Sequence, residues 1–193
     1  MTRSLSIFVA AITVLLTMTA CATAPRPSTA QSDLRRNCDL AVAKAQQSDP
    51  SLAKTLLDSA GYAVFPTVGK DTRRSGASHT TGALYEYDTF VGFCDLTQAP
   101  TSLRLADRAH TQIVVFQTEL AVYHFKGGKL AFEAGNGADT IKSSSVANVN
   151  YSNGVAVFTV NDAGGMYEAS IGGQTFDYQV LDRTNAVAQL DGF

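Results

Sequence analysis

Histidine and carboxylate side chains are the residues in this sequence best suited to acid–base catalysis or metal binding, and their spacing argues against both. The histidines His79, His110 and His124 have no histidine partner four residues away and no cysteine at a metal-binding spacing. Asp95 has no nearby catalytic partner in sequence and is interpreted as a turn residue at a strand end. The phosphate-binding patterns GxGxxG and GxxxxGK are absent. The sequence therefore predicts a protein that is not an enzyme and uses no metal ion or cofactor.

Basic side chains are the remaining candidates for a binding role. If these side chains lay together on one face of the protein, they could bind anionic lipid head groups. Each charge would then contribute about 1 kcal/mol before screening by salt. The simpler interpretation, which the sequence favours, is a dispersed set of solvated charges. The net charge of −2 provides no overall basic field, so nucleic acid is not an expected partner. The candidate contacts with anionic lipid are Lys54, Lys70, Arg73, Arg74, Lys126 and Lys129.

The first residues of the chain are typical of a targeting segment rather than of a fold. Arg3 precedes an apolar stretch, residues 5–18, that is too short for a comfortable membrane span. The Met-Thr-Ala-Cys that ends at Cys21 resembles a bacterial lipobox, with Met18 where leucine is usual. This resemblance predicts that Cys21 is acylated and becomes the first mature residue. The alternative is an ordinary secretory signal, because the small residues around the cysteine also suit the peptidase of soluble exported proteins.

Cleavage before Cys21 would divide the chain into a signal peptide (1–20), a tether (21–31) and one domain (32–193). The tether has two prolines and small polar residues but no apolar periodicity. Several acyl chains, at about 0.8 kcal/mol per buried CH₂, would make a permanent anchor. By analogy with lipoprotein sorting, Ala22 after the cysteine indicates the periplasmic face of the outer membrane.

The two remaining cysteines are expected to form a disulfide. Cys38 lies on the apolar stripe of the first predicted helix, Cys94 lies near the end of a predicted strand, and the periplasm is oxidising. With Cys21 acylated, Cys38–Cys94 is the only intramolecular bridge available. The alternative is a pair of buried free thiols that behave as small apolar residues.

Two helices are predicted before any strand. The first covers 32–47, with apolar residues at helical spacing and Ser32 or Asp33 as its cap. The second starts with Asp49 as its N-cap, and Gly61 ends it as the first residue beyond the helix.

Strand periodicity follows the helices. A polar loop over 69–81 precedes a hairpin of strands 83–87 and 90–96, which turns at Asp88 and Thr89. The other expected elements are strands at 62–68, 101–105, 112–116, 130–134 and 176–180, and a helix over 119–126 capped by Thr118.

The segment 153–178, NGVAVFTVNDAGGMYEASIGGQTFDY, predicts a hairpin at the centre of the sheet, because its first strand, 155–160, is apolar on both faces. Its GVAVFTV and GGMYEASIGGQTF resemble the C-terminal half of the bacterial SYLF domain, and so do GYAVFPTVGK (61–70) and VGFCDLTQ (91–98). The prediction for the fold class is α+β, with N-terminal helices packed on a largely antiparallel, strongly curved β-sheet.

The SYLF family is described as lipid-binding. Together with the lipobox-like residues, the resemblance implies an outer-membrane-anchored periplasmic lipoprotein whose domain binds membrane lipid, with anionic phospholipid as the candidate, without enzymatic activity. Eukaryotic relatives bind phosphoinositides and, in yeast, actin filaments, and neither target is expected in a periplasm. The alternative function is an envelope scaffold that binds a protein partner and has no lipid role beyond its acyl anchor.

Overall fold

The computed structural model describes residues 29–69, 78–98, 109–132, 151–161, 165–168 and 173–180. Within them the elements are α1 (Thr29–Ser48), α2 (Ser51–Asp58), β1 (Gly61–Val68), β2 (Ser78–Glu86), β3 (Thr89–Gln98), β4 (His110–Phe116), α4 (Glu119–Lys126), β5 (Ala131–Phe132), β6 (Val155–Val160), β7 (Met166–Glu168) and β8 (Gln174–Val180). None of the helices in these ranges is long and apolar enough to cross a membrane.

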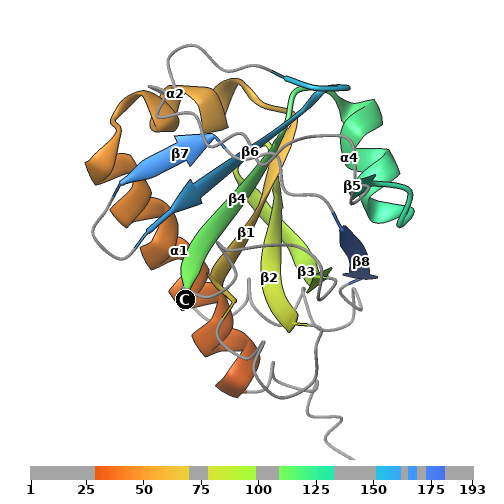
Figure 1. The fold of residues 1–193 in the computed structure, drawn as a ribbon, viewed down its shortest axis with the longest axis horizontal. Helices are drawn as coiled ribbons and strands as arrows, with labels where there is room; N and C mark the ends of the chain where they lie inside the picture. Colours follow the sequence, from red (N-terminus) through yellow and green to blue (C-terminus); the bar gives the residue numbers. More distant parts are fainter. Residues whose placement is uncertain are drawn as a thin grey trace, which may run out of the picture.

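The strands form one sheet in the order β5-β8-β3-β2-β1-β4-β6-β7, and each neighbouring pair is antiparallel. α1 and α2 lie on one side of the sheet, and α4 lies on the other side beside β5 and β8 (Figure 1). The predicted class, α+β with N-terminal helices on a curved antiparallel sheet, is confirmed.

Each face of the sheet has its own hydrophobic cluster, because successive side chains of a strand point to opposite faces. On the face covered by α1 and α2, here the α1 face, the main members are Cys38, Leu52, Leu56, Tyr62, Val64, Tyr85, Ile113, Val115, Phe158 and Val160. On the opposite face, here the α4 face, they are Phe65, Leu84, Cys94, Leu96, Val114, Phe116, Val122, Phe125, Val155, Val157 and Phe176.

The sheet is concave on the α4 face. Phe65 on β1 and Phe176 on β8 have ring centroids 5.8 Å apart, although β3 and β2 lie between these strands. The amides of Gln112 on β4 and Gln174 on β8 form two reciprocal N–H···O bonds of 2.9 and 3.0 Å across three intervening strands. Side chains reach each other over that distance only if the sheet curls around them.

Glycines on the concave face permit this curl. A Cβ at Gly82 would lie 2.2 Å from the carbonyl oxygen of Val64 and 2.6 Å from the ring of Phe65. A Cβ at Gly92 would lie 2.8 Å from both the Tyr178 ring and a backbone oxygen of β8. Glycine at such positions is a common way to bend a sheet, because a neighbouring ring can occupy the space of the missing side chain.

The helix starts follow from short-range hydrogen bonds. Thr118 accepts a hydrogen bond from the Ala121 N–H at 3.3 Å, which confirms the predicted cap of α4. The predicted N-cap of α2, Asp49, is one residue too early: Pro50 is the N-cap, and Asp49 before it accepts a hydrogen bond from the Ser51 N–H at 3.0 Å. α1 begins at Thr29, so the predicted caps, Ser32 and Asp33, lie inside the helix, and the end of the expected tether is helical.

Several boundaries differ from the predictions. Gly61 does not end α2 but starts β1, where an added Cβ would meet the carbonyl oxygen of Tyr85 at 2.6 Å. The β2–β3 hairpin turns at Tyr87 and Asp88, whose φ angles are 47° and 62°, one residue earlier than expected. Asp95 is not a turn residue: it lies within β3 and accepts a hydrogen bond from Thr81 Oγ1 at 2.6 Å.

The hairpin expected at the centre of the sheet is at one edge. β6 is the last strand but one, and β7 closes that side of the sheet with three residues. The sequence suggested a central strand because β6 is buried on both faces, and that burial is observed. It arises because the two hydrophobic clusters cover both faces of β6.

The expected Cys38–Cys94 disulfide is absent, and both thiols are free and buried. Cys38 belongs to the α1 face, where its Sγ lies 3.4 Å from the Val64 carbonyl oxygen, whereas Cys94 belongs to the α4 face. Cys38 reaches the sheet from α1, and Cys94 lies on the other face of the sheet, so the sheet separates the two thiols. Burial raises the pKa of the Cys38 thiol to about 12 and that of Cys94 well above its usual value.

These thiols are expected to be unreactive in the folded protein. Alkylation at pH 8 should be slow in the native state, because each thiol is protonated and inaccessible. Unfolding in denaturant without reductant should expose Cys38 and Cys94 together, and mass spectrometry would count the alkyl groups. A chain that accepts no label at these positions until it is reduced would contradict the structure.

Candidate functional site

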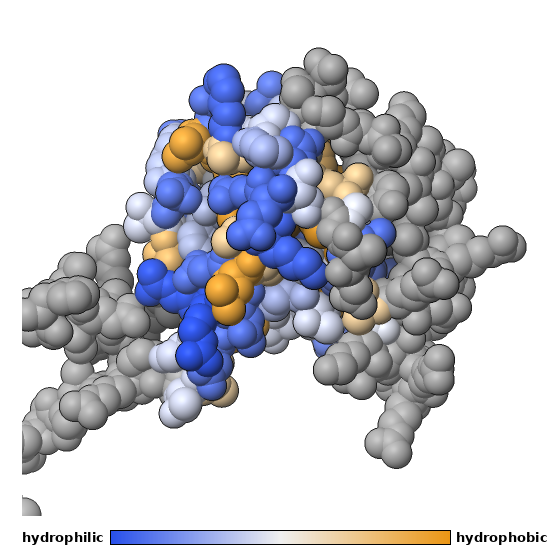
Figure 2. All heavy atoms as spheres, turned by 90° about the vertical axis from the view of Figure 1, so that its left-hand side faces the viewer, coloured by the Kyte–Doolittle hydropathy of each residue, from blue (hydrophilic) through white to orange (hydrophobic). Residues whose placement is uncertain are grey.

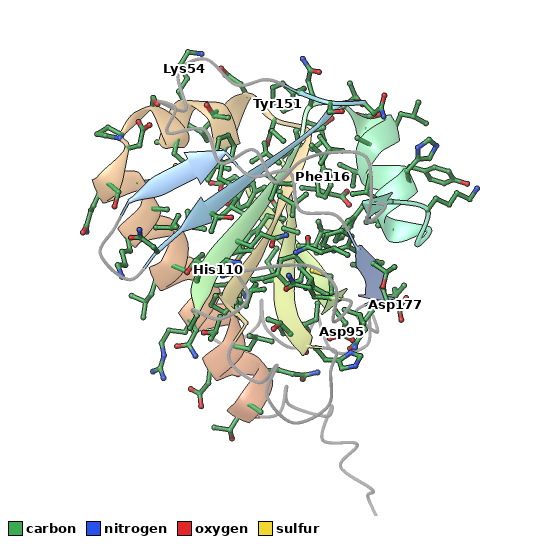
Figure 3. The ribbon with its side chains drawn as sticks, in the orientation of Figure 1. Lys54, Asp95, His110, Phe116, Tyr151 and Asp177 are labelled. Atoms are coloured by element: carbon green, nitrogen blue, oxygen red, sulfur yellow. The ribbon has the colours of Figure 1, made fainter. Side chains whose placement is uncertain are left out.

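The predicted basic residues that the structure describes do not gather on one face. Lys54 is on α2, forms an ion pair with Asp58 one turn later, and lies on the far side of the molecule from α4 (Figure 3). Lys126, at the end of α4, forms an ion pair with Glu86 of β2. Lys129 follows α4 and is exposed, with its Nζ 6.0 Å from the ring centroid of Tyr123. Only Lys126 and Lys129 are neighbours.

Other predicted positions lie outside the described residues. These are the signal peptide and Cys21, the loop residues Lys70, Arg73 and Arg74, the strand 101–105, and Ile171 in the second strand of the C-terminal hairpin.

A groove runs along α4, between this helix and the β2–β3 turn. Its volume is about 230 Å³. We call it the α4 groove; it is lined by Ala60, Glu86, Tyr87, Glu119, Val122, Tyr123 and Lys126. The helix and the turn are joined by a hydrogen bond of 2.5 Å from the Tyr87 hydroxyl to Glu119 Oε1. This bond raises the pKa of Tyr87, so the phenol remains protonated and donates.

Large apolar and aromatic side chains are exposed around the groove. Tyr87, Leu120 and Tyr123 are 62%, 62% and 64% exposed. Leu120 and Tyr123 are three residues apart on α4 and therefore share one side of the helix. Together with Lys129 they form what we call the α4 surface. This surface combines apolar, aromatic and cationic side chains at one end of the molecule.

The α1 and α2 side of the molecule has a different character. Figure 2 shows it as mostly hydrophilic, with hydrophobic residues in separate spots. Leu40 of α1 and Leu57 of α2 are exposed there. Single exposed leucines are ordinary on a protein surface and need no partner.

Charges in the α4 groove are unequal in number. Glu86 and Lys126 neutralise one another in a partly buried ion pair, and Lys126 also lies 5.1 Å from the ring centroid of Tyr178. Glu119 forms no ion pair with any residue that the structure describes. Of the charged residues that line the groove, Glu119 is therefore the one without an ion-pair partner among the described residues, and it lies next to the exposed Tyr87.

The opposite end of the concave face contains buried polar side chains. Gln98, Gln112, Thr159 and Gln174 are at most 2% exposed, and His110 is 5% exposed. Strand alternation places all five on the α4 face, two or four residues from members of its hydrophobic cluster. Gln112 and Gln174 satisfy one another, so this group contributes to the packing of the sheet.

Two acidic residues lie side by side on the outer side of β3 and β8. Asp95 and Asp177 are direct partners on these strands, and Asp95 also accepts a hydrogen bond from Gln179 at 2.5 Å. Both are visible at the edge of the molecule in Figure 3. Among the described residues, no group of three or more histidine, cysteine, aspartate or glutamate side chains is placed to hold a metal ion.

No protein-family model matches the chain, and no curated protein matches it.

Sequence reasoning missed the aromatic and apolar half of the α4 site. Tyr87 was assigned to a strand end, and Leu120 and Tyr123 received no role. The available signal was the composition of α4, ELAVYHFK, which has more apolar residues than one buried face can use. Ala121, Val122 and Phe125 fill the buried face, so Leu120 and Tyr123 remain outside.

Proposed function

We propose that this protein is a non-enzymatic, lipid-anchored envelope protein whose domain binds the surface of a membrane through α4. The observation that carries the proposal is the α4 surface, where exposed Leu120 and Tyr123 lie beside Lys129. Leucine inserts into the acyl boundary, tyrosine prefers the head-group level, and lysine attracts anionic lipid. The lipobox-like residues before Cys21 and the SYLF-like segments of the sequence support the same proposal.

An acyl anchor on Cys21 would make weak binding by the domain sufficient. The anchor holds the domain at high local concentration near the bilayer, so a contact of a few side chains can control its orientation. The outer-membrane location follows from Ala22 and is part of the same proposal.

Removing the apolar side chains of α4 is expected to weaken vesicle binding. The test uses the chain from residue 21 onward with Cys21→Ser, so that no acyl group contributes. Flotation with anionic vesicles should show that Leu120→Ala combined with Tyr123→Ala raises the apparent Kd about tenfold, since roughly half of each side chain's transfer free energy is lost. Binding of the unsubstituted protein should rise with anionic lipid and fall with salt.

Leu57→Ala is the matched control, because Leu57 is 68% exposed on the α2 side. An equal loss of binding in the control would remove α4 from the proposal. Absence of vesicle binding by the unsubstituted chain would favour the alternative, an envelope scaffold that uses the same α4 surface for a protein partner.

A further inference from the structure

Deepening the proposed function, on which this inference rests, we propose that the α4 groove receives the ammonium group of a zwitterionic phospholipid head group. The groove opens beside Leu120 and Lys129, the residues proposed to meet the bilayer. Its volume of about 230 Å³ suits a small head group rather than a protein segment.

The chemistry of the lining favours a cation. Tyr87 and Tyr123 supply two exposed aromatic rings, and aromatic faces attract ammonium groups, more strongly where water is excluded. Glu119, which accepts the hydrogen bond from the Tyr87 hydroxyl, supplies a negative charge that forms no ion pair with a described basic side chain. An anionic group entering the same groove would meet Glu119 and would find Lys126 already paired with Glu86.

Lysines of the protein itself already occupy aromatic faces in this region. Lys126 Nζ lies 5.1 Å from the ring centroid of Tyr178, and Lys129 Nζ lies 6.0 Å from that of Tyr123. Both contacts lie within or at the usual range for cation–π attraction. The Tyr87 ring, on the other wall of the groove, has no such contact with a lysine or arginine that the structure describes, so its face is open to an external ammonium group.

The backbone conformation at Tyr87 is unfavourable for a bulky side chain. Its φ of 47° lies in the left-handed region, where a turn of this kind favours asparagine or glycine and a bulky residue is strained. A tyrosine at this position disfavours the turn and places an aromatic ring at the groove.

The test compares two vesicle compositions with a fixed share of phosphatidylglycerol. In one the remaining lipid is phosphatidylethanolamine, and in the other it is an uncharged glycosyl diacylglycerol. The chain from residue 21 onward with Cys21→Ser should bind the ethanolamine vesicles about tenfold more tightly, the ratio that one carboxylate and two rings can supply.

Two variants should reduce this ratio to near one without weakening binding to the glycolipid vesicles: Glu119→Gln, which removes the charge, and Tyr87→Asn, which removes a ring from a turn that favours asparagine. Asp177→Asn, the same change of charge on exposed Asp177 of β8, should leave the ratio unchanged. Thermal melts followed by circular dichroism would verify that each variant is folded.

A ratio of one for the unsubstituted chain, with binding to both vesicles retained, would overturn the ammonium site and leave the proposed membrane function standing. An unchanged ratio in Glu119→Gln would also overturn it. Failure to bind either vesicle would overturn the proposed function itself, and this inference with it.

Discussion

Phe158→Ala is expected to lower the free energy of unfolding by about 3–5 kcal/mol. Phe158 is 1% exposed, lies in the middle of β6, and belongs to the α1-face cluster that also contains Leu52 and Leu56. Truncation leaves a cavity between the sheet and the two helices, which the packed surroundings cannot fill. Most single domains are stable by about 5–15 kcal/mol, so the variant would lose a large part of that margin.

Urea unfolding followed by circular dichroism would measure this loss. Val180→Ala is the control, since Val180 is 78% exposed at the end of β8 and its truncation should change stability by less than about 0.5 kcal/mol. A change below about 1 kcal/mol for Phe158→Ala would place β6 at the surface, in conflict with the structure.

Gln112→Met is expected to cost about 2–5 kcal/mol, although methionine has nearly the shape of glutamine. The substitution removes both hydrogen bonds to Gln174 and leaves a fully buried amide with an unsatisfied donor and acceptor, each at about 1–3 kcal/mol. Gln174→Met should be destabilising for the same reason.

The double variant Gln112→Met with Gln174→Met provides the decisive comparison. It should recover most of the lost stability, because replacing both partners by apolar groups of similar shape can be nearly neutral. Unfolding free energies of the four proteins form a double-mutant cycle. Losses that simply add would show that the two amides do not meet and that the sheet is flatter than described.

Local elements were predictable because their signals are local. Leu52 and Leu56 fix the buried side of α2 by their spacing, and Thr118 caps α4 as predicted. Which strands lie side by side in the sheet was not predictable from such local signals. The order β5-β8-β3 depends on residues far apart in the chain, and the edge position of β6 cannot be recognised when both its faces are apolar.

The α4 groove was not predictable for a related reason. Its walls come from the β2–β3 turn and from α4, and the bond that joins them, Tyr87 to Glu119, spans 32 residues of sequence. The position of the turn was also difficult to predict, because residues with positive φ in such turns are usually asparagine or glycine and here the first of them is Tyr87. A basic side chain can be identified from its residue type alone. The exposure of Leu120 and Tyr123 depends on how α4 packs, so it is known only from the structure.

The position of β8 determines when the sheet can be completed. β8 lies between β3 and β5, and its Tyr178 hydroxyl donates a hydrogen bond to the Val91 carbonyl oxygen, 87 residues earlier. A growing chain therefore carries an open β3 edge until residues 174–180 have been synthesised, and such long-range pairing is slow to form. Truncation before Gln174 would leave that edge exposed to aggregation.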